Sequence, residues 1–451
     1  MSISARASRL HRARAGFSLC LLAAWVLSGL PHPLMSLLGP KAVQMRAPVL
    51  EFEAAQLAEG LGALEAFRGQ ARVLRTVPTP GGVAWQATDA TDLPRRYLGL
   101  GGEAVPQDDR ALAEWLMRHY TGATEAVAEA ELLTDFDADY PWVNRLLPVW
   151  RLRLDRPDGL TAYIHTETGA MTTLGDARRR VLQRVFRTVH TLDPLRGMEP
   201  VRLALIGAAM AVLLAAALAG VLMWALRRPV ASASPARRWH RRLALWVALP
   251  LLLMASTGLV HLIATAGEAP PRGLALPEAL PALGLPDGLP LAPDARLRAA
   301  GVVMGPESRP VLWVTPVSGP PRQFSVDPSG RWNEIDIEAL AQAVAARWVP
   351  AGVDAPVKLT HFSPDYDFRN RRLPAWQVRD ADGAWISIDH ATGQRLDYVG
   401  AARHVEGWVF SVGHKWQPLS HWVGPAWRDL VQALLLLLGV AVGVLGIRLR
   451  R

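Results

Sequence analysis

The sequence of 451 residues contains one cysteine, Cys20, and this scarcity excludes several kinds of site. A lone cysteine can form neither an intrachain disulfide nor a thiolate-ligated cluster, and the lack of a C-x-x-C-H motif excludes covalently attached c-type haem. The sequence also lacks a glycine-rich phosphate loop, an H-E-x-x-H motif and a serine, histidine and aspartate arrangement. The common motifs of nucleotide binding, zinc proteolysis and serine hydrolysis are therefore missing.

Hydrophobic residues make up 50% of the chain and gather in four long runs. Three of the runs exceed the roughly 20 residues that an α-helix needs to cross a bilayer, and the last is slightly shorter. The runs cover residues 15–38, 203–226, 243–266 and 430–447. We therefore expect an integral membrane α-helical protein that contacts lipid and has room for domains outside the bilayer.

The formal net charge of +9 comes largely from arginines beside these runs. Such clusters mark the cytoplasmic side of a membrane, so the excess charge does not indicate a nucleic-acid partner. This rule predicts that the N-terminus, the connection 227–242 and the C-terminus are cytoplasmic, with residues 40–200 and 268–428 on the opposite side. A cleaved signal peptide is the alternative for the first run, although that run lacks a convincing small-x-small cleavage motif.

The first and third runs carry the same arrangement of histidines. Each begins with a histidine beside arginines and has a hydroxyl residue and a glycine near its end, with a second histidine three residues later. The spacing from His11 to His32 equals that from His240 to His261 and corresponds to about 31 Å of helix. Each helix is therefore expected to place one imidazole near either face of a membrane.

Residues outside the runs are repeated as well. Residues 134–152 align without a gap to 360–378, and V-F-x-x-x-H occurs at 185–190 and again at 409–414. The pattern predicts a tandem duplication of helix, external domain and helix. Because each unit crosses the membrane twice, both copies enter from the same side, and we expect an approximate two-fold axis along the membrane normal.

Each external segment is predicted to be a small α+β module. Helical spacing occurs at 108–120 in the first and at 334–348 in the second. The expected strands lie near 147–154 and 160–166, and near 355–361, 373–379 and 384–389. In the first half, the expected order is an N-terminus and first span at 1–38, a first module with its approach to the second span at 39–200, and the second span at 201–226. A connection at 227–242 leads to the second half. There, the expected order is the third span at 243–266, a Pro- and Gly-rich linker at 267–293, a second module with its approach at 294–429, and the last span with the C-terminus at 430–451.

The sequence contains a helix that begins W-H-R-x-L and ends near a T-G step, a strand that runs into D-x-x-T-G, and V-F-x-x-x-H before a return helix. This pattern resembles the PepSY-associated transmembrane proteins, over most of the chain and in both halves. The resemblance implies four transmembrane helices in a bacterial inner membrane and two periplasmic PepSY-like modules. Family proteins of this type include haem-containing reductases of ferric siderophores, which implies haem b held by membrane histidines. The first copy departs from the pattern at Leu10, Pro31 and Pro33.

Haem b is bound by two imidazoles on opposite faces of the porphyrin, often supplied by different helices. Two histidines of one helix lie a membrane apart, so ligation of one iron must run between helices. Polar groups at membrane depth generally face a bundle interior, which favours the pairs at the periplasmic border as ligands. The pair at the cytoplasmic border is interpreted equally well as interfacial residues that meet lipid headgroups. The repeat-matched candidates for one or two haems are His32 and His261, His190 and His414, and His11 and His240.

Other residues are weaker candidates, and no catalytic residue is assigned. His421 could replace His414 as a ligand, and Arg145 and Arg371 could either hold an anionic siderophore or brace the modules. The remaining histidines are interpreted as surface or satisfied residues: His119, His165, His361, His390 and His404.

The expected function is a membrane reductase that passes single electrons to a periplasmic ferric siderophore. The connection of about sixteen residues is too short for a nicotinamide or flavin domain, so the electrons would come from a cytoplasmic partner or a quinol. A PepSY envelope protein that regulates a peptidase or senses a signal, with its helices as anchors, is the alternative. A transporter is disfavoured because the four runs contain no acidic residue.

Overall fold

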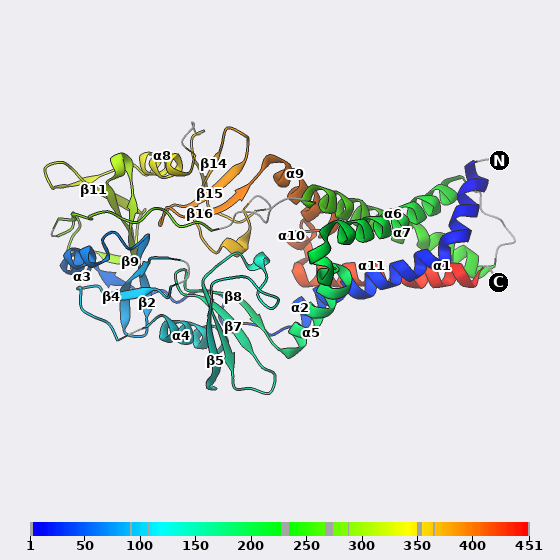
Figure 1. Cartoon of the computed structure of the whole chain (residues 1–451), viewed down its shortest axis with the longest axis horizontal. Coiled ribbons are helices and arrows are strands. Elements are labelled where there is room, and N and C mark those ends of the chain that lie inside the picture. Colours follow the sequence, from blue (N-terminus) through cyan, green and yellow to red (C-terminus); the bar gives the residue numbers. More distant parts are fainter. Residues whose placement is uncertain are drawn as a thin grey trace. The chain divides into compact units, whose positions relative to one another are not determined.

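The computed structural model describes residues 3–90, 93–106, 108–226, 234–266, 274–286, 288–349, 354–363 and 366–449, with the backbone alone for 3–15. The chain forms two compact units. The helical unit comprises Met1–Gly39, Arg178–Ala269 and Ala402–Arg451, and the β-rich unit comprises Pro40–Ala177 and Pro270–Ala401 (Figure 1). The side chain of His11, residues 227–233 of the predicted connection and residues 267–273 of the predicted linker lie outside the described residues.

Four helices of the helical unit are long and apolar enough to cross a membrane, in agreement with the four predicted spans. The candidate spans are Gly16–Leu38, Ala177–Leu226, Pro235–Thr265 and Pro425–Arg448. The long helices within them are α1 (Ile3–Gly29), α6 (Glu199–Leu226), α7 (Pro235–Thr265) and α11 (Pro425–Arg448). The helix α7 begins at a proline in its first turn, after Ser234, whose hydroxyl accepts a hydrogen bond from the Arg237 amide at 3.4 Å. Leucine and alanine dominate the spans and favour the helical conformation.

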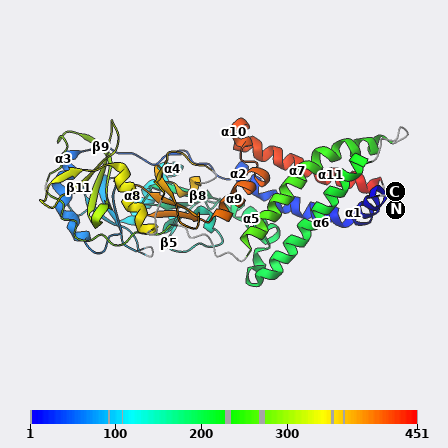
Figure 2. The same cartoon turned by 90° about the horizontal axis from the view of Figure 1, so that it is seen from above.

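The four spans form a bundle in which α1 and α7 each pack against both α6 and α11 (Figure 2). Small residues allow the close approach of these helices. A Cβ atom at Gly439 of α11 would lie 3.1 Å from Cγ1 of Val247 on α7. Each half of the chain therefore contributes its spans to a shared bundle.

Short helices gather at the end of the bundle opposite the two chain termini (Figure 1). Two of them are single turns of π-helix, η3 (Phe186–His190) and η7 (Phe410–His414), which coincide with the two V-F-x-x-x-H segments. Single π-helical turns occur frequently at functional sites. The other short helices are α2 (Pro31–Leu38), α5 (Ala177–Val185), η4 (Asp193–Met198), α9 (Ala401–Val409) and α10 (Leu419–Val423).

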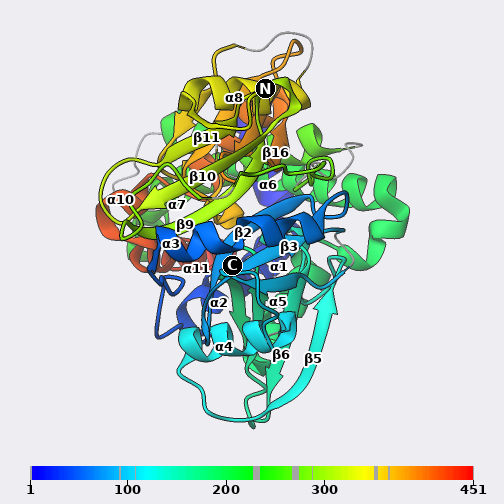
Figure 3. The same ribbon diagram turned by 90° about the vertical axis from the view of Figure 1, so that its left-hand side faces the viewer.

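A central antiparallel sheet built by both halves of the chain organises the β-rich unit (Figure 3). Its order is β12-β11-β10-β9-β2-β3-β4, with β1 paired to β9. The halves join where β2 pairs with β9, with Arg75 opposite Gly301. The strands are β1 (Phe52–Glu53), β2 (Val73–Thr79), β3 (Gly82–Thr88), β4 (Arg96–Gly99), β9 (Arg296–Met304), β10 (Pro310–Pro316), β11 (Arg322–Val326) and β12 (Trp332–Glu334).

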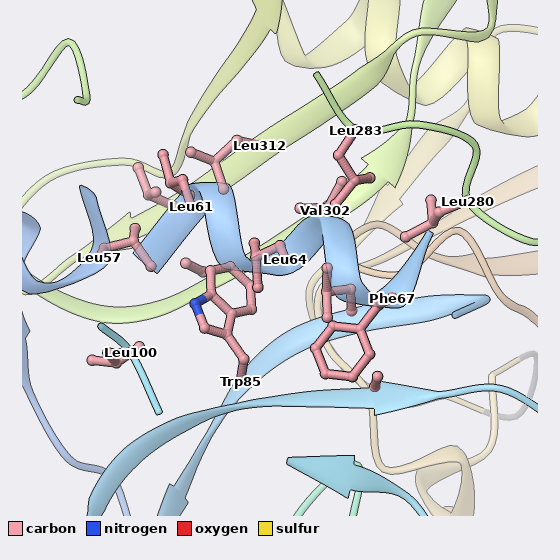
Figure 4. Packing of buried hydrophobic residues seen from close by; sticks show 14 of the residues in the cluster. Leu57, Leu61, Leu64, Phe67, Trp85, Leu100, Leu280, Leu283, Val302 and Leu312 are labelled. Atoms are coloured by element: carbon pink, nitrogen blue, oxygen red, sulfur yellow. The ribbon is translucent and has the colours of Figure 1, made fainter. Parts of the chain in front are cut away.

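One face of this sheet is covered by α3 (Ala54–Gly60) and η1 (Leu61–Phe67), which bury leucines against Trp85 (Figure 4). Leu280 and Leu283, from the segment predicted to be an irregular linker, are buried in the same core. The described part of that segment forms no helix, yet the Leu280 amide donates to the Ala71 carbonyl at 2.7 Å. The segment is thus irregular in conformation but firmly packed.

Two four-stranded antiparallel sheets complete the β-rich unit, each with one helix. The helices start at aspartate caps, since the Asp108 carboxylate accepts from the Ala111 amide at 2.6 Å and Asp336 accepts from Glu338 at 3.1 Å. The first set is α4 (Asp109–Thr121), β5 (Val127–Leu133), β6 (Val149–Leu154), β7 (Thr161–His165) and β8 (Ala170–Gly175). The second is α8 (Ile337–Trp348), β13 (Val357–Leu359), β14 (Ala375–Arg379), β15 (Trp385–Asp389) and β16 (Arg395–Val399).

Matched residues of the two sets occupy the same local structure. The fully buried Tyr140 donates to the Leu146 carbonyl at 2.9 Å, and Tyr366 donates to the Arg372 carbonyl at 2.8 Å. A cis proline follows in each case, at Pro148 and at Pro374. Three-residue 3-10 turns occur at Trp142–Asn144, Phe368–Asn370 and Pro306–Ser308.

The predicted helices and strands of the modules are present with boundaries shifted by a few residues, but the central sheet was not expected from the sequence. Instead of two separate modules, the structure has one unit with a shared sheet. The reason lies in β2, where most side chains on both faces are buried. Such a strand has no alternation of polar and apolar residues to reveal it.

Candidate functional site

Four of the predicted histidines lie at the same end of the helical bundle. His32 is on α2, His261 is near the end of α7, and the two π-turns end in His190 and His414. His190 interacts electrostatically with His414 and with His32, and His414 also interacts with His261. The spacing found in the sequence therefore corresponds to a cluster in space.

In the first half, Phe186 contacts both histidines. Its ring centroid lies 4.9 Å from that of His190, with the rings 22° from parallel, and 5.5 Å from that of His32. The Nδ1 atom of His190 lies 3.2 Å from the Ser28 hydroxyl, which itself donates to the Trp25 carbonyl at 3.1 Å. With its proton directed at Trp25, the Ser28 oxygen can accept from Nδ1–H and so leaves Nε2 of His190 as the basic nitrogen.

The second half repeats this arrangement with tighter stacking. The ring of Phe410 lies between two imidazoles, with centroids 4.0 Å from His261 and 4.6 Å from His414. Nδ1 of His414 lies 2.8 Å from the carbonyl oxygen of Met254. Met254 occupies the position in α7 that Trp25 has in α1, seven residues before the histidine at the helix end. Both π-turn histidines are thus oriented by the matching turn of the neighbouring span.

Glycines make room for both π-turn histidines. A Cβ atom at Gly29 would lie 3.2 Å from Cε1 of His190, and one at Gly258 would lie 3.2 Å from Cε1 of His414. The repeated hydroxyl–glycine step of the sequence therefore has a steric reason, since a larger residue would press against the imidazole.

Glu406 on α9 distinguishes the two halves. Its carboxylate is buried and contacts Nδ1 of His261 directly. The position that matches Glu406 in the first half is Leu182, as judged from the spacing to each V-F-x-x-x-H segment. The second cluster therefore has a carboxylate against an imidazole at a position where the first half has a leucine, and comparison of the two halves in sequence provides no signal for it.

His240 lies at the other end of α7, about 31 Å of helix from His261. Its Nδ1 atom is 3.1 Å from the Val442 carbonyl of α11, and a Cβ at Gly446 would lie 2.7 Å from its Cε1. His240 thus packs against α11 instead of pointing outward. For its partner His11, the structure describes the backbone within α1 alone.

The other sequence candidates lie elsewhere. His421 is exposed on α10, His119 faces the Arg46 carbonyl at 2.9 Å, and His390 faces the Pro374 carbonyl at 3.0 Å. Arg145 pairs with Asp397 at 3.4 Å and Arg371 donates to the Thr172 carbonyl at 3.4 Å, so each contacts the opposite half of the chain. These contacts favour the bracing role for both arginines.

A second polar cluster is buried in the β-rich unit, where the halves meet. The Glu167 carboxylate accepts from Arg372 at 2.6 Å and from Gln394 at 3.0 Å, and it lies 3.8 Å from Arg95. All four side chains are buried. Burial by itself raises the pKa of Glu167, but the neighbouring positive charges outweigh it and hold that pKa well below its usual range.

His165 belongs to the same cluster. Its Nε2 atom lies 2.9 Å from Nη2 of Arg95, and its Nδ1 atom lies 2.9 Å from the Thr168 hydroxyl. Burial, reinforced by the Arg95 charge, depresses the pKa of His165 well below the ordinary value. The imidazole is therefore neutral at pH 7 and accepts a hydrogen bond from Arg95.

Within the described ranges, no group of three or more His, Cys, Asp or Glu side chains is placed to hold a metal ion by itself. Three of the imidazoles are held at Nδ1, those of His190, His261 and His414, and a phenyl ring contacts both imidazoles in each half.

Comparison with known proteins gives one match. The family model described as a PepSY-associated TM region matches residues 74–448, which is most of the chain. No curated protein and no solved structure matches the chain.

Proposed function

We propose that this chain, which belongs to the family of PepSY-associated transmembrane proteins, is a haem-b-containing reductase that passes single electrons to ferric siderophores. In this proposal it lies in a bacterial inner membrane, with both termini cytoplasmic and the β-rich unit periplasmic. The observation that carries the proposal is the pair of matched histidine–phenylalanine–histidine clusters among membrane helices. Imidazoles supplied in pairs by different membrane helices are the donor set of b-type haem.

The donor atoms fit that group. For His190, His261 and His414, Nδ1 faces a hydroxyl, a carboxylate and a carbonyl, respectively, so Nε2 is the nitrogen free to bind iron. The glycines at positions 29 and 258 leave space beside two of the rings. Because Phe410 lies between His261 and His414, one iron cannot contact both while the phenyl ring stays in place, which favours ligand pairs drawn from different halves.

Haem b would supply a one-electron couple, and the chain would supply its position and surroundings. The imidazoles would hold the iron through Nε2, and the apolar spans would exclude water. Glu406 accepts from Nδ1–H of His261 and so increases the electron donation of that imidazole. Reduction serves iron release because ferrous iron is a poorer match than ferric iron for hard oxygen ligands.

Histidines at both ends of the bundle suggest how electrons would cross it. His240 contacts Val442 near the C-terminal end of α11, and His261 of the four-histidine cluster lies at the opposite end of α7 from His240. A second haem near His11 and His240 would supply the remaining part of the path from a cytoplasmic partner or a quinol. The repeated order of strands and helices supports a tandem duplication as the origin of this arrangement.

Absorption spectra of the purified full-length protein, oxidised and reduced, test the proposal. We expect a Soret band that is strongly diminished in His261→Ala and in His414→Ala. His421→Ala is the matched control, since His421 is an exposed histidine seven residues after His414, and it should keep the full spectrum. An unchanged haem content in both cluster variants would refute the site.

A protein purified without any Soret band, even after haem is supplied, would favour the alternative. In that case the spans anchor a PepSY envelope protein that regulates a peptidase or senses a signal. The β-rich unit would then be the functional part, and the His261 and His414 variants would behave as wild type in every assay of that unit.

A further inference from the structure

The segment before α6 has a composition that its repeat does not share. Residues 177–196 contain six arginines and one aspartate, whereas the matching residues 401–420 contain one arginine, one lysine and one glutamate. The aspartate, Asp193, already engages Arg187 and Arg196. A strong positive charge has therefore been placed on one half only.

Topology does not account for this charge. Arginines that fix orientation cluster on the cytoplasmic side, and the cluster at 227–242 lies beyond the opposite end of α6. The arginines of α5 are separated from that cluster by the whole span. They need another explanation.

The apolar residues of the segment are as unusual as its charges. Val181, Val185 and Val189 are exposed by 58%, 42% and 47%, and their spacing of four places them on one side of the helix. Exposed apolar residues continue into the span at Val201 and Leu205. Exposed apolar residues therefore occur both on the valine stripe and at the start of the span that follows it.

The segment cannot simply extend the span. The helical stretch from Ala177 to Leu226 has 50 residues, and as one continuous helix it would be about 75 Å long against a hydrocarbon core of about 30 Å. The chain breaks this helix at Leu192, whose φ of 49° is left-handed. The part before the break therefore lies outside the hydrocarbon core and is free to lie along the membrane surface.

A helix with an exposed apolar stripe beside arginines is the pattern of membrane-surface helices. Arg184 is exposed and has no hydrogen-bond or ion-pair partner among the described residues. We propose that α5 and the turn that follows it bind the phosphate groups of anionic phospholipids, with the valines at the acyl boundary and the arginines on the headgroups. This site is independent of haem and of reductase activity.

The proposed lipid site adjoins the first histidine cluster. Helix α5 runs directly into the π-turn that contains Phe186 and His190. A headgroup held by Arg184 would fix the helix two residues before Phe186. The first half would thus be anchored by charge, while the second half has exposed Trp408 on its corresponding helix.

Native mass spectrometry of the detergent-solubilised full chain, with added phosphatidylglycerol or phosphatidylcholine, tests the proposal. We expect preferential retention of phosphatidylglycerol. Each arginine near a membrane surface contributes roughly a fivefold increase in affinity for anionic lipid. Arg184→Gln should therefore weaken retention roughly fivefold, and Arg178→Gln, Arg180→Gln and Arg184→Gln combined should weaken it on the order of 100-fold. The single variant remains informative if the triple variant folds poorly.

The matched control removes the same charge elsewhere, by changing Arg296, Arg298 and Arg309 of the β-rich unit to glutamine. This variant should retain phosphatidylglycerol as wild type does. Equal binding of the two lipids by wild type, or an equal loss in both triple variants, would overturn the proposal. Retention of a soluble anionic ferric complex by Arg184 in place of phosphatidylglycerol would overturn it as well.

Spin labelling gives a second readout in vesicles of phosphatidylglycerol and phosphatidylcholine. With Cys20→Ser as background, a label is attached at Val185→Cys or at Arg184→Cys. The label at position 185 should be accessible to oxygen and shielded from an aqueous nickel complex, and the label at 184 should show the opposite. Equal aqueous accessibility at both positions would contradict the proposed orientation.

Discussion

Replacing Glu167 by glutamine should strongly destabilise the β-rich unit. Glu167 is 1% exposed and accepts hydrogen bonds from Arg372 of the second half and from Gln394, with Arg95 3.8 Å away. Glutamine keeps the shape of the side chain but removes the negative charge that compensates two buried guanidinium groups.

The expected magnitude follows from the burial of all partners. Removing one member of a buried ion pair costs about 3–5 kcal/mol in the free energy of unfolding, because the other charge is left uncompensated. In a unit of this size 1 kcal/mol corresponds to a shift of about 2–4 °C in the midpoint of thermal unfolding. The midpoint should therefore fall by roughly 6–20 °C.

Thermal unfolding of the full-length protein in detergent, followed by tryptophan fluorescence, measures this shift. Glu129→Gln is the control, because its carboxylate lies 2.7 Å from Arg153 but both side chains are half exposed. An exposed pair contributes at most about 1 kcal/mol, so the control midpoint should change by no more than about 2–4 °C. Equal shifts in the two variants would show that the buried network does not hold the halves together.

Three further outcomes follow. Gly258→Val should reduce haem content because the new side chain would press on His414. Gly207→Ala should not, since its Cβ would meet only a side-chain atom at 3.7 Å. Equal haem content in both variants would contradict the steric role of Gly258. Leu280→Ala should lower the unfolding free energy by about 2–5 kcal/mol, as for other buried leucines, and an effect below 1 kcal/mol in denaturant titration would mean that the segment is only loosely packed. Because the folded-state pKa of His165 lies below its ordinary value of 6.5, the unfolded chain binds the proton more readily, so stability present above pH 6.5 should fall as the pH drops through that value. Thermal unfolding at pH 7 and pH 5 should show this loss, and His165→Asn should reduce it.

The sequence predicts the helical unit well because its signals are repeated. The histidines at 32 and 261, the glycines before them and the two V-F-x-x-x-H segments all occur twice, and each copy supports the interpretation of the other. The structure brings these segments together at one end of the bundle. Their role as haem ligands stays a prediction.

The parts that sequence reasoning missed are those without a repeat or a period. Glu406 replaces a leucine of the other half, so comparison of the copies gives no reason to single it out. The strand β2 is buried on both faces and shows no alternation. Leu280 lies among prolines, where composition suggests a linker, and only its burial against η1 shows that it belongs to a core.

The pairing of β2 with β9 sets an order of events during biosynthesis. The edge of β2 at Arg75 is covered only when Gly301, 226 residues later in the chain, has been synthesised and can pair with it. At a synthesis rate of about 5–20 residues per second this delay is roughly 10–45 seconds, during which two more helices must enter the membrane. A strand edge left open for that time is prone to wrong pairing. The second half must therefore be synthesised before the first half can complete its sheet, and truncation after α6 should yield an aggregation-prone fragment instead of half a protein.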